Sequence, residues 1–315
     1  MNNFLFSLNV VAPLFVIMAT GYAMRAIRFV SEDFLAQLNK LVFKFCLPLM
    51  LFQDIRLSYT GDFSNTRLIF ASLAGISAII LVSFLIVPLT VKRKGQRGSI
   101  IQGIYRSNFL IYGLPLATGM YADRAVVAIA MLMVIMIPFF NVAAVVILSI
   151  YSETGTHKAS VKNLLRDIAS NPLIIGSVAG LLAGMFHLNL PRFVDVPLAQ
   201  LAGIAAPLAL FVLGGEFKFH NLRNNLAKVV AVTLVRLVVI PVIALSIFVY
   251  AGFRDVDLAV LLCIFATPAA MASYIMSKNM GNDGELSGQI VVLTTACSCV
   301  SIFFLIYFLR GWGYL

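Results

Sequence analysis

Charged residues are scarce in this chain. Of its 315 residues, 11% are Asp, Glu, Lys or Arg, whereas a soluble domain carries about 25%. Hydrophobic residues make up 61%, and the mean hydropathy is +0.98. The composition therefore excludes a soluble domain. The apolar runs are long and do not alternate with polar residues, which predicts an all-α integral membrane protein.

Histidine and cysteine are also rare. The three histidines fall on different loops, and the four cysteines lie inside apolar runs, without the spacing of a metal site or of a disulfide framework. The sequence has no glycine-rich phosphate loop. We therefore expect no enzymatic activity, no cofactor and no bound metal.

The apolar runs divide the chain into ten expected membrane spans, each close to the length of about 20 residues that a bilayer requires. These spans are 4–24, 34–55, 67–90, 99–121, 125–150, 171–188, 198–217, 226–250, 257–278 and 286–310.

Lysine and arginine are distributed unevenly among the loops. The loops after odd-numbered spans carry 13 of them, against 6 in the even loops and the C-terminus. Because cytoplasmic loops are enriched in Lys and Arg, the odd loops are expected to be cytoplasmic and both termini to lie outside the cytoplasm. The net charge of +10 is then an orientation signal. We expect a multi-pass protein of the cell inner membrane, with the lipid bilayer as partner and no nucleic acid.

Two proline motifs indicate an internal repeat. Pro48-Leu-Met-Leu-Phe52 and Pro207-Leu-Ala-Leu-Phe211 lie 159 positions apart (207 − 48), and the same offset places Pro13 on Pro172 and Gly21 on Gly180. Each half holds five spans, an odd number, so the second half is expected to enter the membrane inverted. The expected repeats are residues 1–155 and 156–315.

The spans contain almost no negative charge. The acidic residues fall at or beyond span ends, whereas Lys40, Lys44, Arg106 and Arg236 lie inside spans. The two lysines are close enough to the interface to snorkel. A charge deeper in the membrane usually faces a polar interior, which makes Arg106 and Arg236 candidate functional residues. This balance favours an anionic substrate over a cation.

Helix-breaking sequence interrupts the fourth span of each half. Span 4 contains Asn108-Phe-Leu-Ile-Tyr-Gly113-Leu-Pro115, and span 9 contains Ala266-Thr267-Pro268. Proline removes a helical hydrogen bond, so both helices are expected to break at these motifs. Paired broken helices point to a midplane substrate site, where helix N-termini offer free N–H groups to an anion.

These residues resemble a known family. The run Asn108-x-Leu110-x-x-Gly113-x-Pro115 is similar to the fourth-helix motif of plant auxin efflux carriers. The segments from Asn171 and from Ala206 to Gly215 resemble bacterial members of the auxin efflux carrier family, which include malate and malonate permeases. Leu110 departs from the glycine that many bacterial members carry there.

The resemblance implies ten helices in two inverted repeats. Spans 1, 2, 6 and 7 would form a scaffold, and spans 3–5 and 8–10 a transport domain in which spans 4 and 9 cross at their breaks. Asn108 would bind substrate, with the backbone around Gly113, Pro115, Thr267 and Pro268 completing the site and Arg106 or Arg236 adding positive charge.

The resemblance thus implies an alternating-access carrier of small carboxylates such as malate or malonate. It leaves open proton or sodium coupling and assembly as a homodimer. One alternative is a sodium-coupled organic anion symporter of the bile-acid type, in which Thr267, Thr294, Thr295 or Ser298 would supply oxygen ligands. Another is a channel or a receptor, although the short loops argue against a receptor.

Overall fold

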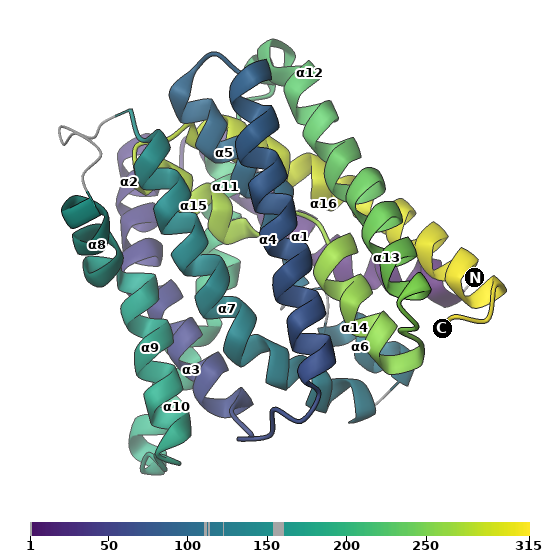
Figure 1. The fold of residues 1–315 in the computed structure, drawn as a ribbon. Coiled ribbons are helices and arrows are strands. Elements are labelled where there is room, and N and C mark those ends of the chain that lie inside the picture. The colour runs from purple at the N-terminus through teal and green to yellow at the C-terminus, as the bar shows by residue number, and fades with distance from the viewer. Residues whose placement is uncertain (1, 110–111, 113, 122, 154–160) are drawn as a thin grey trace.

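A computed structural model describes residues 2–109, 112, 114–121, 123–153 and 161–315. The described chain is a bundle of helices (Figure 1), and its described residues contain one isolated β-bridge and no named strand. The all-helical architecture expected from the long apolar runs is confirmed. The helices are α1 (Asn2–Ala26), α2 (Glu32–Leu41), the π-helix η1 (Val42–Cys46), α3 (Leu47–Ser58), α4 (Thr66–Thr90), α5 (Lys94–Tyr105), α6 (Leu114–Tyr121), α7 (Asp123–Tyr151), α8 (Val161–Ser170), α9 (Pro172–Met185), α10 (Arg192–Gly203), α11 (Ala205–Glu216), α12 (Phe219–Leu234), the π-helix η3 (Val235–Val239), α13 (Ile240–Tyr250), α14 (Asp255–Ala266), α15 (Met271–Asn279) and α16 (Gly284–Gly311).

Six helical segments of the described chain are long and apolar enough to cross a membrane. They are Glu32–Ser58, Thr66–Thr90, Arg124–Tyr151, Arg192–Glu216, Arg223–Tyr250 and Gly284–Gly311. Each coincides with one of the spans expected from the sequence. The range 171–188 holds the shorter apolar helix α9, and 4–24 lies within α1. The segment between the fifth and sixth ranges, read from the sequence as a loop, contains α8.

The other two expected spans are each interrupted, as the sequence predicted. The fourth is divided between α5 and α6, and the ninth between α14 and α15. In the ninth, Pro268 lies inside the break, because the residue before a proline is driven out of the helical conformation. Thr267 is accordingly extended, with φ −73° and ψ 153°.

The break in the fourth span lies earlier than the proline suggested. The chain leaves the helix at Arg106, which is extended with φ −82° and ψ 102°. Pro115 is instead the second residue of α6. Phe109 and Tyr112 are already in π-helical conformation ahead of the proline. The prediction that the helix breaks at Pro115 is therefore corrected to a break at Arg106.

A glycine packs closely against each of the two repeat motifs, at equivalent positions. Gly21 of α1 packs against α11 so closely that a β-carbon there would stand 2.1 Å from the carbonyl oxygen of Phe211. Gly180 of α9 packs against α3 in the same manner, with a β-carbon 2.6 Å from the carbonyl oxygen of Phe52. Both glycines and both phenylalanines are related by the offset of 159 residues. Only a residue without a side chain permits these approaches, so α1 on α11 and α9 on α3 form two matching helix pairs.

Candidate functional site

The two broken helices are joined to each other at their breaks. Ser107 and Ala269 form an antiparallel β-bridge. The backbone N–H of Asn108 donates to the Pro268 carbonyl at 2.9 Å, and the N–H of Ala270 donates to the Arg106 carbonyl at 3.0 Å. We call this pairing of residues 106–108 with 267–270 the crossover. The crossover provides hydrogen-bond partners for backbone groups that have none within their helices. Inside a membrane every backbone polar group requires such a partner.

A cavity of about 70 Å³ opens beside the crossover. Arg106, Ser107 and Asn108 line it on one side, together with residues 270–272 at the start of α15. Met50 and Leu51 of α3 and Ala209 of α11, all within the two repeat motifs, also line it, together with Leu47 and Ala206, which directly precede the motifs. The repeated proline motifs, which sequence reasoning used as markers of symmetry, therefore also form a wall of the candidate site.

Two polar side chains of the crossover border this cavity in adjacent positions. Asn108, the residue singled out by the sequence, is 6% exposed. Ser107 is 4% exposed, and its hydroxyl has no hydrogen-bond partner among the described residues. A buried hydroxyl without a partner is uncommon, because its desolvation is uncompensated. Sequence reasoning missed Ser107; its position next to Asn108 was the only signal that could have identified it.

Arg106 is buried in a network of neutral polar groups. Its Nη2 donates to Asn141 Oδ1 at 2.6 Å, and Asn141 Nδ2 donates to Ser177 Oγ at 3.1 Å. When the Gln102 amide is oriented so that both of its polar atoms are satisfied, it accepts from Arg106 Nη1 at 3.2 Å. No ion pair of the described residues includes Arg106. Its positive charge at the cavity wall is thus held by amides and is not neutralised by a carboxylate.

Arg236 of η3 is fully buried but does not line the cavity. Its guanidinium donates to four backbone carbonyls at the ends of two helices. Nε bonds the Thr267 oxygen at 2.9 Å and Nη2 the Ile264 oxygen at 3.1 Å, while Nη1 bonds the Ile104 and Tyr105 oxygens at 3.1 and 3.5 Å. The structure therefore places Arg236 behind the crossover. Its expected contribution of positive charge stays a prediction.

The remaining predicted site residues contribute backbone or lie elsewhere. Pro268 supplies the carbonyl that accepts from Asn108, and Thr267 donates its hydroxyl to Cys263 within α14 at 2.7 Å. Gly113 lies outside the described residues, and Pro115 is known only by its place in α6. Within the described ranges, no three His, Cys, Asp or Glu side chains gather where they could hold a metal ion.

Three of the four hydroxyls proposed for a sodium site in the alternative function, those of Thr267, Thr294 and Ser298, are engaged in local bonds. Thr294 Oγ1 accepts from the Ala269 N–H at 3.2 Å and donates to its own helix at the Ile290 carbonyl, at 2.7 Å. Ser298 Oγ donates to the Thr295 carbonyl at 2.7 Å. Thr294 thereby fixes the crossover to α16.

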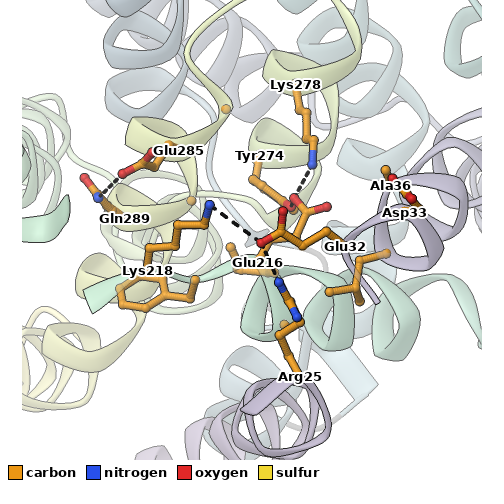
Figure 2. Close-up of a pocket in the computed structure, with 16 residues that line it drawn as sticks. Arg25, Glu32, Asp33, Ala36, Glu216, Lys218, Tyr274, Lys278, Glu285 and Gln289 are labelled. Carbon is orange, nitrogen blue, oxygen red and sulfur yellow. Dashed lines mark hydrogen bonds and ion pairs between the residues drawn. The ribbon is translucent and has the colours of Figure 1, made fainter. Parts of the chain in front are cut away.

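A larger cavity of about 550 Å³ lies at the end of α11 and beside α15. Figure 2 shows its charged lining, to which α1, α2, α11, α15 and α16 contribute. Glu216, at the end of α11, accepts from the Tyr274 hydroxyl and from Lys278 Nζ, both on α15. Arg25 pairs with Glu32 at 2.5 Å. We call this cavity the vestibule. Its loops are those expected to be cytoplasmic.

Two helices, α11 and α15, line both the vestibule and the crossover cavity. Ala206 and Ala209 of α11 line the crossover cavity, while Leu213 and Glu216, one to two turns further along the same helix, line the vestibule. On α15, Met271 lines the first and Tyr274 the second. The hydrogen bond between Tyr274 and Glu216 thus joins α15 to α11 at the vestibule.

Comparison with known proteins places these features in a family. A family model described as "Membrane transport protein" matches residues 6–306. A protein of Rhizobium meliloti named "Putative malonate transporter" is 22% identical, with 96% of each chain covered. An uncharacterized transporter of Methanothermobacter thermautotrophicus is 23% identical over 95% of this chain and 97% of its own. The uncharacterized transporter YfdV of Escherichia coli K12 is 25% identical over 84% of this chain and 86% of its own. The match to the family model spans nearly the whole chain, so this protein belongs to the membrane transport protein family, that of the auxin efflux carriers.

Proposed function

We propose that this protein is a secondary carrier of small organic anions such as malonate or malate, and that the crossover cavity binds the carboxylate. The observation that carries the proposal is the meeting of Arg106, Ser107 and Asn108 with the start of α15 at one small cavity. A helix N-terminus carries partial positive charge and free N–H groups, and both favour an anion. The described residues that line the cavity include no carboxylate.

The size of the cavity supports a small substrate. Pockets for drug-sized ligands measure about 300 to 1,000 Å³, whereas this one measures about 70 Å³. Apolar side chains such as Phe109, Ile137 and Phe140 supply much of the rest of the wall. They would exclude water around the carbon skeleton, while the polar side chains and the helix end hold the charged group.

The arrangement of helices supports transport by alternating access. We propose ten spans in two inverted repeats, with α1, α2, α3, α9, α10 and α11 as the scaffold. The remaining spans would form the transport domain. The crossover cavity then lies between scaffold and transport domain, which is where a sliding movement would expose it to either side in turn. The vestibule would be its cytoplasmic approach, closed by the contact of Glu216 with Tyr274 and Lys278.

Reconstituted uptake tests the proposal. Purified protein in liposomes is expected to accumulate labelled malonate or malate under an imposed potential or proton gradient. Asn108→Ala should abolish this uptake, because it removes a polar group that lines the cavity. Asn189→Ala, in an exposed loop, is the matched control and should transport like the wild type. The substrate proposal fails if the wild type moves no organic anion.

The same liposomes separate the alternatives. An absolute requirement for sodium would favour a symporter of the bile-acid type over a carrier driven by potential or protons. Flux that does not saturate with substrate, and that unlabelled substrate does not compete, would indicate a channel. We expect saturable and competable uptake.

A further inference from the structure

Arg236 has an unusual partner for a buried arginine. A buried charge is normally paired with an opposite charge, yet no ion pair of the described residues includes Arg236. Its guanidinium bonds only backbone carbonyls, at the C-terminal ends of α5 and α14. The C-terminal end of a helix carries about −0.5 of an elementary charge, so the two ends together carry about −1. The counter-charge of Arg236 is therefore the backbone itself.

The helix ends that meet at the crossover cancel one another when Arg236 is left out. The C-terminal ends of α5 and α14 meet there. They are opposed by the N-terminal end of α15, at the cavity, and by that of the helical segment after Asn108, where Phe109 is already π-helical. Two ends of about −0.5 and two of about +0.5 sum to roughly zero. Without Arg236, the charge of Arg106 would be the only net charge that the described residues leave to favour an anion at the cavity.

We propose that Arg236 is a positioning residue that strengthens the preference of the crossover for anions beyond what Arg106 alone supplies. By neutralising the two negative helix ends through their carbonyls, it leaves the positive end of α15 and the charge of Arg106 unopposed at the cavity. It does so without touching the substrate. This inference rests on the proposed transport of organic anions.

Ligands that differ only in charge provide the test. Malonate at pH 7.5 is a dianion, and monomethyl malonate has a similar skeleton with one negative charge. An electrostatic contribution scales with ligand charge, so the fold-loss in affinity for the dianion should be the square of the loss for the monoanion. If Arg236→Gln raises the Kd of monomethyl malonate about threefold, that of malonate should rise about ninefold. A role in folding alone would change both Kd values by one factor or lower the fraction of active protein.

Two further variants complete the experiment. Arg310→Gln removes an exposed arginine of α16 and should leave the ratio of the two Kd values unchanged. Arg236→Lys keeps the charge but lacks the planar group that reaches both helix ends. Arg236→Lys should melt at a lower temperature than the wild type and still bind malonate in preference to monomethyl malonate. This variant provides the test if Arg236→Gln does not fold. Equal fold-losses for both ligands in Arg236→Gln, or loss of the dianion preference in Arg236→Lys, would overturn the inference. Absence of any anion binding by the wild type would instead refute the proposed function.

Discussion

Replacing Ala270 with proline tests the crossover by removing one of its hydrogen-bond donors. Ala270 has φ −69° and ψ 138°, values that proline adopts without strain. The substitution therefore removes the N–H that bonds the Arg106 carbonyl at 3.0 Å, and the proline ring carbon that takes the place of this hydrogen pushes the carbonyl away.

The size of the effect follows from the buried acceptor. A buried carbonyl left without a partner costs about 1 to 3 kcal/mol. Proline restricts the unfolded chain, which offsets about 0.4 to 1 kcal/mol of this loss. The net loss of roughly 1 to 2 kcal/mol corresponds to a factor of about 5 to 30 in the equilibrium between the paired and the separated crossover. We expect a lower melting temperature in detergent and malonate uptake reduced by a similar factor.

Serine at the same position should act in the opposite direction on stability. Ala270 is the N-cap of α15 and has no side chain able to accept from the first turn. A serine hydroxyl there typically stabilises a helix by about 1 kcal/mol. It would also occupy N–H groups proposed to bind the substrate carboxylate. Ala270→Ser should therefore melt at a higher temperature than the wild type but bind malonate more weakly. A proline variant that melts and transports like the wild type would refute the crossover hydrogen bond.

Two further predictions concern packing and pH. Gly180→Ala should destabilise the protein by about 1 to 3 kcal/mol, because its β-carbon meets the α3 backbone at 2.6 Å. Gly203→Ala, with open space around it, should be neutral or slightly stabilising, and thermal melts would compare the two. The Glu153 carboxylate accepts from the Arg93 guanidinium and from a backbone N–H, and these bonds lower its pKa below the ordinary value of 4.5. The stability that the Glu153 carboxylate contributes is present above pH 4.5 and is lost as the pH falls through the lowered pKa. The melting temperature of Glu153→Gln should therefore vary less with pH in that range than that of the wild type. Equal pH dependence of the two melting temperatures would contradict this prediction.

The sequence predicted the features that depend on local chemistry. Proline removes a helical hydrogen bond, and Pro115 and Pro268, at corresponding places in the two halves, identified the two interrupted spans. Long apolar runs identified the others. The repeat prolines predicted a correspondence between the halves that the glycine contacts of Gly21 and Gly180 match. Asn108 was selected from a motif and lies at the cavity.

Features that depend on contacts between distant segments were beyond sequence reasoning. The position of the first break follows from Arg106 pairing with Ala270, which lies 164 positions away (270 − 106), and not from a nearby proline. Arg236 bonds carbonyls at the ends of two helices, which requires α5, α14 and η3 to meet. The hydroxyl of Ser107 is distinctive only because the fold buries it without a partner. None of these relations leaves a local pattern in the chain.

Equilibrium binding of labelled malonate to the purified protein tests the central claim most directly, because it requires neither a coupling ion nor a direction of transport. The account predicts saturable binding of one malonate per chain by the wild type and by Asn189→Ala, and a loss of binding by Asn108→Ala in protein that still melts cooperatively. Equal binding by the wild type and by Asn108→Ala, or no binding by either, would contradict the assignment of the crossover cavity as the anion site.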